Sequence, residues 1–221
     1  MRLLAIDTAW EASSVAVMDG ERMVVRSENI GRGHAEILMR QIEAAMAAAA
    51  LAVADLDRIA VTVGPGSFTG LRIGIAAARG IALVTGKPAI GVGVLAAHAA
   101  EVRQTAPVAV LAVLAAGRGE LYGQRFAADG TPLDEPHAAP PEVFAANLDR
   151  GEVLAGSGAD LVIAALPMDE KPRVAHRRSS PDVSALARLA ALAPASASPP
   201  RPLYIRPPDA RPQDAARIAR R

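Results

Sequence analysis

The segment GPGSFTGLRIG, residues 64–74, joins a β-branched stretch to a helical one. Residues 58–63 predict a buried strand, and residues 69–84 predict a helix that stops at Gly86, with Pro88 beyond it. A strand, a tight glycine turn and a helix in direct succession are typical of α/β folds. The segment therefore favours an α/β architecture.

The glycines of this loop allow two interpretations. Backbone N–H groups at a helix N-terminus can bind phosphate. The spacing of Gly64, Gly66 and Gly70 does not match a dinucleotide fingerprint, because the third glycine falls one residue late, and no Lys follows Gly70 as a P-loop requires. The pattern favours the other interpretation, a tight loop in which Ser67 or Thr69 caps the helix.

Upstream of the glycine loop, the sequence predicts strands followed by a helix. The strands are predicted at residues 2–6, 13–18 and 21–28. Asp19-Gly20 marks a type I′ turn between the last two. Residues 34–50 have apolar side chains at helical spacing. Residues 1–102 are accordingly predicted to form a first lobe.

The second half of the chain follows a similar order. Strands are predicted at residues 108–114, 120–127 and 152–155, with helices after residue 158 and at 182–193. This is a repeat of architecture and not of residues, and it indicates an α/β class with mixed sheets. Residues 103–200 are predicted to form a second, smaller lobe, and 201–221 a basic C-terminal segment.

Composition excludes several function classes. Cysteine is absent from the 221 residues, so disulfides, thiolate metal ligands and a Cys nucleophile are excluded together, which fits a reducing cytoplasm. The net charge of +1 argues against a stand-alone nucleic-acid binder. No uncharged stretch is long enough for a membrane helix, and Asp7 interrupts the apolar start that a signal peptide needs.

Residues that bear chemistry are few. Asp7 ends the first strand, where catalytic acids often lie in phosphate-transfer folds, and Thr8 follows it. One acid without a partner is weak support for catalysis, and Asp7 has the alternative role of organising the turn. No two of the four histidines are spaced as a helical metal clamp, so no metal site is expected.

Two helices carry more apolar surface than one sheet face can hide. Between residues 71 and 84 the only charged residues are Arg72 and Arg79, and the helix at 34–50 contains a long Ala run. Such helices are covered on more than one side. The cover is either another part of this chain or a second protein subunit, and both alternatives stay open at this point.

The order of several motifs resembles that of the TsaB (YeaZ) family over nearly the whole chain. They are Ile6-Asp7-Thr8-Ala9, residues 64–74, Gly91-Val92, Gly119-Glu120-Leu121-Tyr122, Gly156-Ser157-Gly158 and Pro202-Leu203-Tyr204-Ile205-Arg206. The resemblance implies an actin/Hsp70/sugar-kinase-like fold with two ribonuclease-H-like lobes. It also implies a vestigial ligand site at Asp7, Thr8, Gly156, Ser157 and Gly158.

The resemblance further implies a non-catalytic scaffold and dimerisation subunit. Its partner would be the catalytic paralogue TsaD, which transfers a threonylcarbamoyl group to N6 of adenosine 37 in tRNAs that read codons beginning with A. A TsaE-like ATPase would join the assembly, tRNA would be met indirectly, and the chain would pair with itself when TsaD is absent. No cofactor is expected, although nucleotide at the partner interface stays an alternative, and no membrane partner is expected.

Specific residues follow from this resemblance. The paralogue's metal site uses an HxxxH pair, and here His34 matches its first member while position 38 is Leu. Relatives commonly have Asp-Ala-Arg where this chain has Ala115-Ala116-Gly117, which weakens any ligand role there. The expected interface residues are His34, Leu38, Gln41, Ala45, Arg72, Ile73, Ala76, Ala77 and Arg79.

Two further classes compete with the scaffold. An enzyme of the same superfamily, either a nucleotide-dependent kinase or a glycoprotease-like protein, would need an acid opposite Asp7, a metal pair or a nucleophile. The sequence offers no good candidate for any of these. A homodimeric interaction module would explain the apolar helices equally well.

Overall fold

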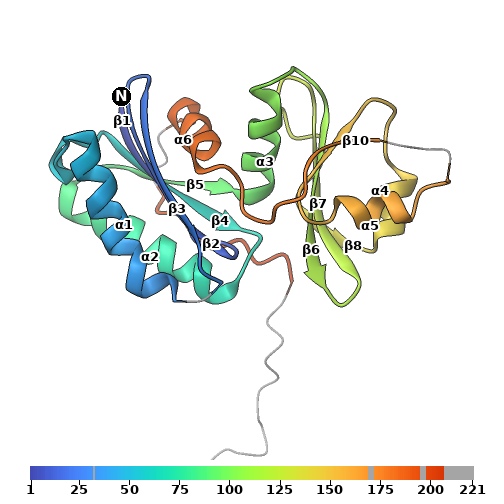
Figure 1. Ribbon diagram of the computed structural model, residues 1–221, viewed down its shortest axis with the longest axis horizontal. Helices are drawn as coiled ribbons and strands as arrows, with labels where there is room; N and C mark the ends of the chain where they lie inside the picture. The colour runs from blue at the N-terminus through green and yellow to red at the C-terminus, as the bar shows by residue number, and fades with distance from the viewer. Residues whose placement is uncertain (32, 169–171, 195–197, 207–221) are drawn as a thin grey trace, which may run out of the picture.

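The computed structural model describes residues 1–31, 33–168, 172–194 and 198–206. Two five-stranded mixed sheets form two lobes side by side (Figure 1). The first sheet contains β1 (Arg2–Asp7), β2 (Ala12–Asp19), β3 (Arg22–Asn29), β4 (Arg58–Gly64) and β5 (Ala89–Gly93). The second contains β6 (Val110–Gly117), β7 (Glu120–Phe126), β8 (His137–Ala139), β9 (Val153–Ala155) and β10 (Arg173–His176). The helices are α1 (His34–Ala49), α2 (Phe68–Thr85), α3 (Val94–Arg103), α4 (Pro141–Ala146), α5 (Ala159–Ala164) and α6 (Val183–Leu192), with a 3₁₀ turn at Val53–Asp55.

The two lobes repeat one topology. Each has three antiparallel strands, then a helix, a parallel strand, a helix, a further parallel strand and a last helix. The strand orders, β3-β2-β1-β4-β5 and β8-β7-β6-β9-β10, are the same. The expected α/β class and the repeat of architecture are therefore confirmed. Sequence patterns did not predict the short strands β5, β8 and β10, which are at most five residues long.

The last helix of each repeat packs on the sheet of the other repeat. Helix α3 lies against β6 and α6, while α6 lies against β1 and β2 (Figure 1). On α6, Leu186 and Ala187 share a core cluster with Leu3 and Ala5 of the first sheet. The predicted lobe boundaries need correction for this reason, because residues 183–193 belong spatially to the first lobe.

Helices α1 and α2 cover the opposite face of the first sheet (Figure 1). Apolar residues from both helices, including Leu38 and Leu71, pack on strand residues such as Ile6 and Val15. Helix α2 is long and apolar enough to cross a membrane. Because Leu71, Ile75 and Ala78 are buried within the chain, it is instead a helix of this fold with one side left uncovered.

The chain then returns between the lobes. The Leu203 N–H donates to the Val63 carbonyl of β4 at 2.7 Å. Arg206 donates to the Ala116 carbonyl of β6 at 3.0 Å and pairs with Glu120. This segment therefore connects the first sheet with the β6–β7 hairpin. The remainder of the predicted basic segment, residues 207–221, lies outside the described residues.

Replacing a glycine of α2 by alanine should have opposite effects on stability at two positions, Gly70 and Gly80. A Cβ at Gly70 would collide with the Thr8 carbonyl, whereas one at Gly80 meets nothing within 4 Å. Gly70→Ala should lower the free energy of unfolding by about 1–3 kcal/mol through overpacking. Gly80→Ala should raise it by about 0.5–1 kcal/mol through helix propensity. Urea unfolding of both variants at one protein concentration measures this, and equal effects would contradict the packing described.

Candidate functional site

The glycine loop is held against the turn that follows β1. The Ser67 N–H donates to the Ala9 carbonyl at 2.7 Å, and the Thr8 hydroxyl donates to the Gly70 carbonyl at 2.7 Å. A Cβ on Gly66 would lie only 2.5 Å from the Ala9 oxygen. Because the glycines permit backbone-to-backbone contact, their arrangement supports the packing interpretation over phosphate binding.

Specific contacts also hold both ends of the glycine loop. The Ser67 hydroxyl accepts a hydrogen bond from the Gly70 N–H at 3.3 Å, so Ser67 is the N-cap of α2 as predicted. Thr69, the other predicted cap, is exposed. Gly64 has φ 124°, and a Cβ there would lie 2.7 Å from the Leu203 carbonyl, so this glycine admits the returning C-terminal segment.

Asp7 is fully buried at the end of β1. Its Oδ1 accepts from the Thr62 hydroxyl at 2.7 Å and from the Ala9 N–H at 3.1 Å. Its Oδ2 has no hydrogen-bond partner among the described residues. Burial raises the pKa of Asp7 to about 6, against the opposing effect of its two hydrogen bonds. A perturbed carboxyl of this kind is a candidate functional group.

The glycine triplet of the second lobe has a similar structural role. Gly156 has φ 111°, and a Cβ there would collide with the Val113 carbonyl of β6. A Cβ on Gly158 would lie 2.9 Å from Leu121 Cδ2. The Ser157 hydroxyl accepts from the Ala115 N–H at 3.2 Å. These bonds stay within the second lobe, as those of Asp7 and Thr8 stay within the first.

The α1 residues expected at a partner interface prove to be core residues of the chain itself. The ring of His34 lies 2.9 Å from the Trp10 carbonyl through Nε2. Gln41 accepts from the Ser13 hydroxyl at 2.7 Å, and Leu38 and Ala45 are buried in the core. This corrects the prediction for these four residues, because the apolar stripe that marked them is the one that faces the sheet. The outer side of α1 presents Ala35, Met39 and Glu43 instead.

The α2 residues expected at the interface are placed differently. Arg72, Ala76 and Arg79 are exposed, whereas Ile73 and Ala77 are half-buried and pack partly on the core. The Arg72 guanidinium lies 3.6 Å from the centroid of the Phe68 ring and donates to the Tyr204 hydroxyl at 3.2 Å. Arg72 is therefore held by the C-terminal segment.

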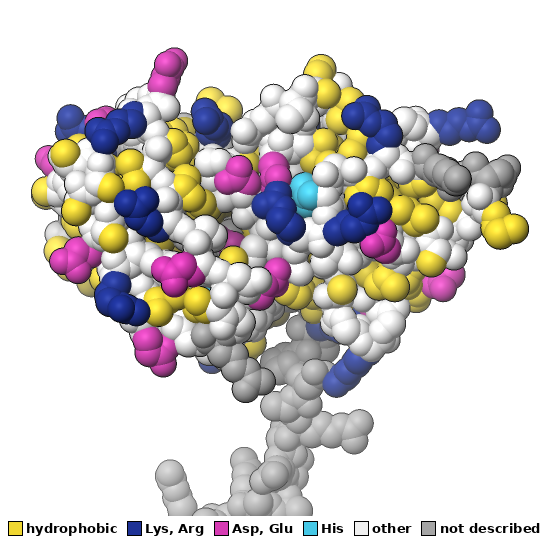
Figure 2. All heavy atoms as spheres, viewed as in Figure 1, with side chains coloured by type: hydrophobic (Ala, Val, Ile, Leu, Met, Phe, Trp, Pro, Cys, Tyr) yellow, Lys and Arg dark blue, Asp and Glu magenta, His cyan; other side chains and the backbone are white. Residues whose placement is uncertain are grey.

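A hollow of about 660 Å³ opens between the N-terminal ends of α1 and α2. Trp10, Ala35, Thr69 and Ile73 line it together with seven other residues. It lies beside the glycine loop, between the first turns of the two helices. On the face drawn in Figure 2, acidic and basic side chains are interspersed, in keeping with the near-neutral charge.

The structure also brings together residues that sequence order had left unrelated. His98 and His176 belong to the sequence ranges predicted for different lobes, yet their ring centroids are 5.0 Å apart. Glu101, three residues after His98 on α3, completes the group. Only the His-x-x-Glu spacing on one helix face was visible in the sequence, and it gave no indication of His176.

Two repeated ribonuclease-H-like lobes with exchanged last helices define a two-lobed protein of the actin/Hsp70/sugar-kinase type. The family model of TsaD, tRNA N6-adenosine threonylcarbamoyltransferase, matches residues 25–147. YeaZ from Pseudomonas aeruginosa superposes with a TM-score of 0.81 and 28% identity, over 92% of this chain and 99% of that one. The chain belongs to the TsaB (YeaZ) family, which takes part in the biosynthesis of tRNA threonylcarbamoyladenosine.

Sequence relatives cover most or about half of the chain. An uncharacterized protein of Mycobacterium tuberculosis is 38% identical over 213 residues, or 95% of this chain and 94% of the relative. The tRNA threonylcarbamoyladenosine biosynthesis protein TsaB of Escherichia coli is 37% identical over 130 residues, or 58% of this chain and 56% of that protein.

The raised pKa of Asp7 predicts how stability depends on pH. Since the folded pKa of Asp7 is about 6 and its ordinary value is 3.8, the protonated carboxyl favours the fold below pH 4, and this contribution is lost as pH rises through 6. Asp7→Asn keeps the neutral form at every pH. Above pH 7 its free energy of unfolding should therefore exceed that of wild type by about 2–3 kcal/mol, because the pKa of Asp7 differs by about two between the folded and unfolded states. At pH 4 the two free energies should be nearly equal. Urea unfolding of both proteins from pH 4 to 8 measures the difference, and a constant difference would contradict the burial of this charge.

Proposed function

We propose that this chain is the non-catalytic scaffold and dimerisation subunit that supports a TsaD-like catalytic subunit. That partner would transfer the threonylcarbamoyl group to N6 of adenosine 37 in tRNAs reading codons that begin with A. The observation that carries the proposal is the uncovered side of α2. Only five of its eighteen residues are buried, although the helix is apolar along most of its length.

The uncovered side is suited to helix packing. Ala76 and Gly80 are exposed and small, so a partner helix can approach the backbone closely. Leu83 and Val84, at the C-terminal end, are 84% and 87% exposed. Large apolar side chains in such a position are typical of protein–protein contacts. With the outer side of α1, a contact of two helices from each chain would supply the roughly 800 Å² per partner that a stable interface needs.

The α1 residues support a role without chemistry. His34 matches the first histidine of the paralogue's metal pair, but its Nε2 contacts the backbone carbonyls of Trp10 and Ala12. Leu38, at the position of the second histidine, is fully packed in the core. A metal at this place would find one imidazole turned toward the chain and an aliphatic side chain where a ligand is needed.

The remaining members of the assembly follow from the family. A TsaE-like ATPase joins the assembly, and tRNA contacts this chain only indirectly, through the catalytic subunit. When that subunit is absent, the chain forms a homodimer through the uncovered side of α2. The chain works in the cytoplasm and needs no cofactor of its own, nucleotide at the partner interface being the alternative. Leu203 and Arg206, which occupy the space between the lobes, support the absence of an autonomous nucleotide site.

Depletion of this chain in its host should lower the tRNA content of threonylcarbamoyladenosine, because the catalytic subunit loses its scaffold. Re-expression of the wild-type chain should restore the nucleoside, and the purified chain alone should transfer no threonylcarbamoyl group. Mass spectrometry of digested tRNA measures the first two outcomes. Unchanged modification after depletion would refute the assignment.

A single exposed alanine tests the interface. Ala76→Glu places a bulky charged side chain on the uncovered side of α2 and should abolish co-elution with the TsaD-like subunit. The side chain blocks close helix approach, and burying a charge carries a desolvation cost even when a neighbouring arginine pairs with it. Ala76 is a better position than Ala77, which packs partly on the core. The matched control is Ala164→Glu, at an exposed alanine of α5 in the other lobe, which should leave co-elution intact.

Both variants should keep the circular dichroism spectrum of the wild-type chain when isolated, since neither position is buried in the chain itself. Size-exclusion chromatography with the partner at equal concentrations gives the readout. Retention of wild-type affinity in Ala76→Glu would rule this face out as the interface while leaving the depletion result to judge the function separately.

A further inference from the structure

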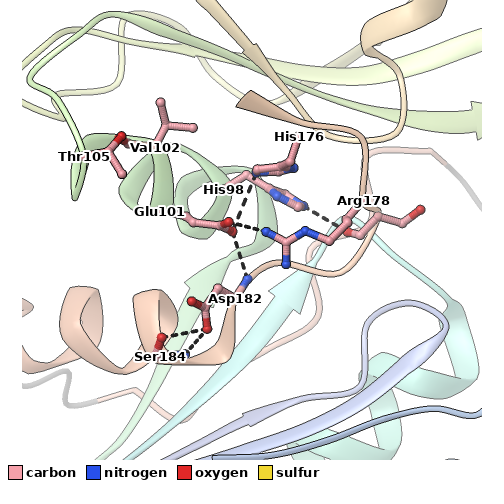
Figure 3. Close-up of polar contacts among 9 residues, drawn as sticks. His98, Glu101, Val102, Thr105, His176, Arg178, Asp182 and Ser184 are labelled. Carbon is pink, nitrogen blue, oxygen red and sulfur yellow. Dashed lines mark hydrogen bonds and ion pairs between the residues drawn. The ribbon is translucent and has the colours of Figure 1, made fainter. Parts of the chain in front are cut away.

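Two histidines and a glutamate, residue types that can ligate a metal, meet at the junction of α3, β10 and the segment that leads into α6 (Figure 3). His98 and Glu101 lie one helical turn apart on α3, and His176 is the last residue of β10. One donor atom from each residue lies within 4.8 Å of the other two. His98 is fully buried, and the side chains of His176 and Glu101 are 11% and 20% exposed.

The hydrogen bonds of His98 fix which of its nitrogens is free. Its Nε2 lies 2.9 Å from the Ser179 carbonyl, which can only accept, so Nε2 carries the proton. The Nδ1 of the neutral ring then presents a lone pair, and it faces His176 (Figure 3). A ligating histidine in proteins commonly donates its other N–H to a carbonyl in this way.

The cluster has unpaired polar atoms that a ligand would satisfy. Nδ1 of His98 and both ring nitrogens of His176 are buried and lack a hydrogen-bond partner among the described residues. Buried polar atoms without partners are rare in native proteins, and each calls for an explanation.

Glu101 is already oriented for a shared ligand. Arg178 binds its Oε1, and the Asp182 N–H donates to Oε2 at 3.1 Å. That Oε2 lies 3.6 Å from Nε2 of His176. Ligand atoms around a tetrahedral zinc ion lie about 3.3–3.6 Å apart, given bonds of about 2.0–2.2 Å, so this pair already has a suitable separation. The other donor atoms, which lie within 4.8 Å, need to approach by at most about 1.5 Å. The Arg178 side chain is half exposed, so solvent screens its repulsion of a cation.

We propose that His98, Glu101 and His176 bind a divalent transition metal, with zinc the best match to two imidazoles and one carboxylate. A hollow of about 240 Å³, lined in part by Glu101 and His176, gives the ion access and leaves room for water at a fourth position. The ion links α3 to the edge strand of the second sheet. The expectation of no metal site came from sequence order, in which His98 and His176 are far apart.

The test uses the untagged full-length chain, stripped of metal with a chelator and titrated with zinc chloride. Isothermal titration calorimetry should show one equivalent bound, and zinc should raise the melting temperature, since an ion that binds only the folded state stabilises it. His176→Gln should lower the affinity at least about 100-fold, more than loss of an outer hydrogen-bond partner does. His137→Gln is the control, because that ring contacts the Glu135 carbonyl and the Phe144 ring outside the cluster, and its loss should leave the zinc affinity unchanged.

A second variant, Glu101→Gln, guards against a folding defect in His176→Gln and should weaken zinc binding as well. The circular dichroism of each variant without zinc establishes that it is folded. Absence of stoichiometric binding to the wild-type chain would overturn the proposal. Equal zinc affinity in the wild-type chain and in whichever cluster variant folds would overturn it too, because the ion would then be held elsewhere on the surface.

Discussion

The close contact between the glycine loop and the end of β1 determines how the first lobe is built. Gly66 and Gly70 bring the loop backbone against the carbonyls of Ala9 and Thr8, where no side chain would fit. This contact fixes the start of α2 beside the edge of the sheet, and the helix then runs across the outer face with α1 at its side. The side of α2 left uncovered is therefore a consequence of backbone packing at its first turn.

Local patterns predicted most strands and helices, since each depends on its own apolar spacing and turn residues. They could not reveal that α3 and α6 are exchanged between the repeats, because an apolar helix face shows that it is buried but not which sheet buries it. The same limit misplaced Leu38 and Ala45, which cover the chain's own sheet. Ser67 was predictable because capping is a local interaction.

The candidate site likewise combines features that the sequence predicted with features that only the tertiary structure shows. Asp7 and Thr8 were visible as polar residues at the end of a buried strand, yet the buried, unpaired Oδ2 and its effect on the pKa depend on the surrounding fold. The His98–Glu101–His176 cluster depends on contacts between α3 and the last strand of the chain, which no spacing rule describes. Non-local proximity of this kind is supplied only by the tertiary structure.

The exchange of α3 and α6 also separates the two proposed sites. The uncovered side of α2 lies on the outer face of the first sheet, whereas the cluster lies between the lobes, where α3 meets α6 and β10. An ion at the cluster would connect helix α3, which follows the first sheet in the chain, to the edge of the second sheet. Because α3 itself packs on β6, the ion would act on the second sheet and its covering helix, away from the proposed partner surface on the first sheet. Sites without shared contacts contribute to stability and binding nearly independently, so zinc at the cluster is expected to leave the proposed partner surface unchanged.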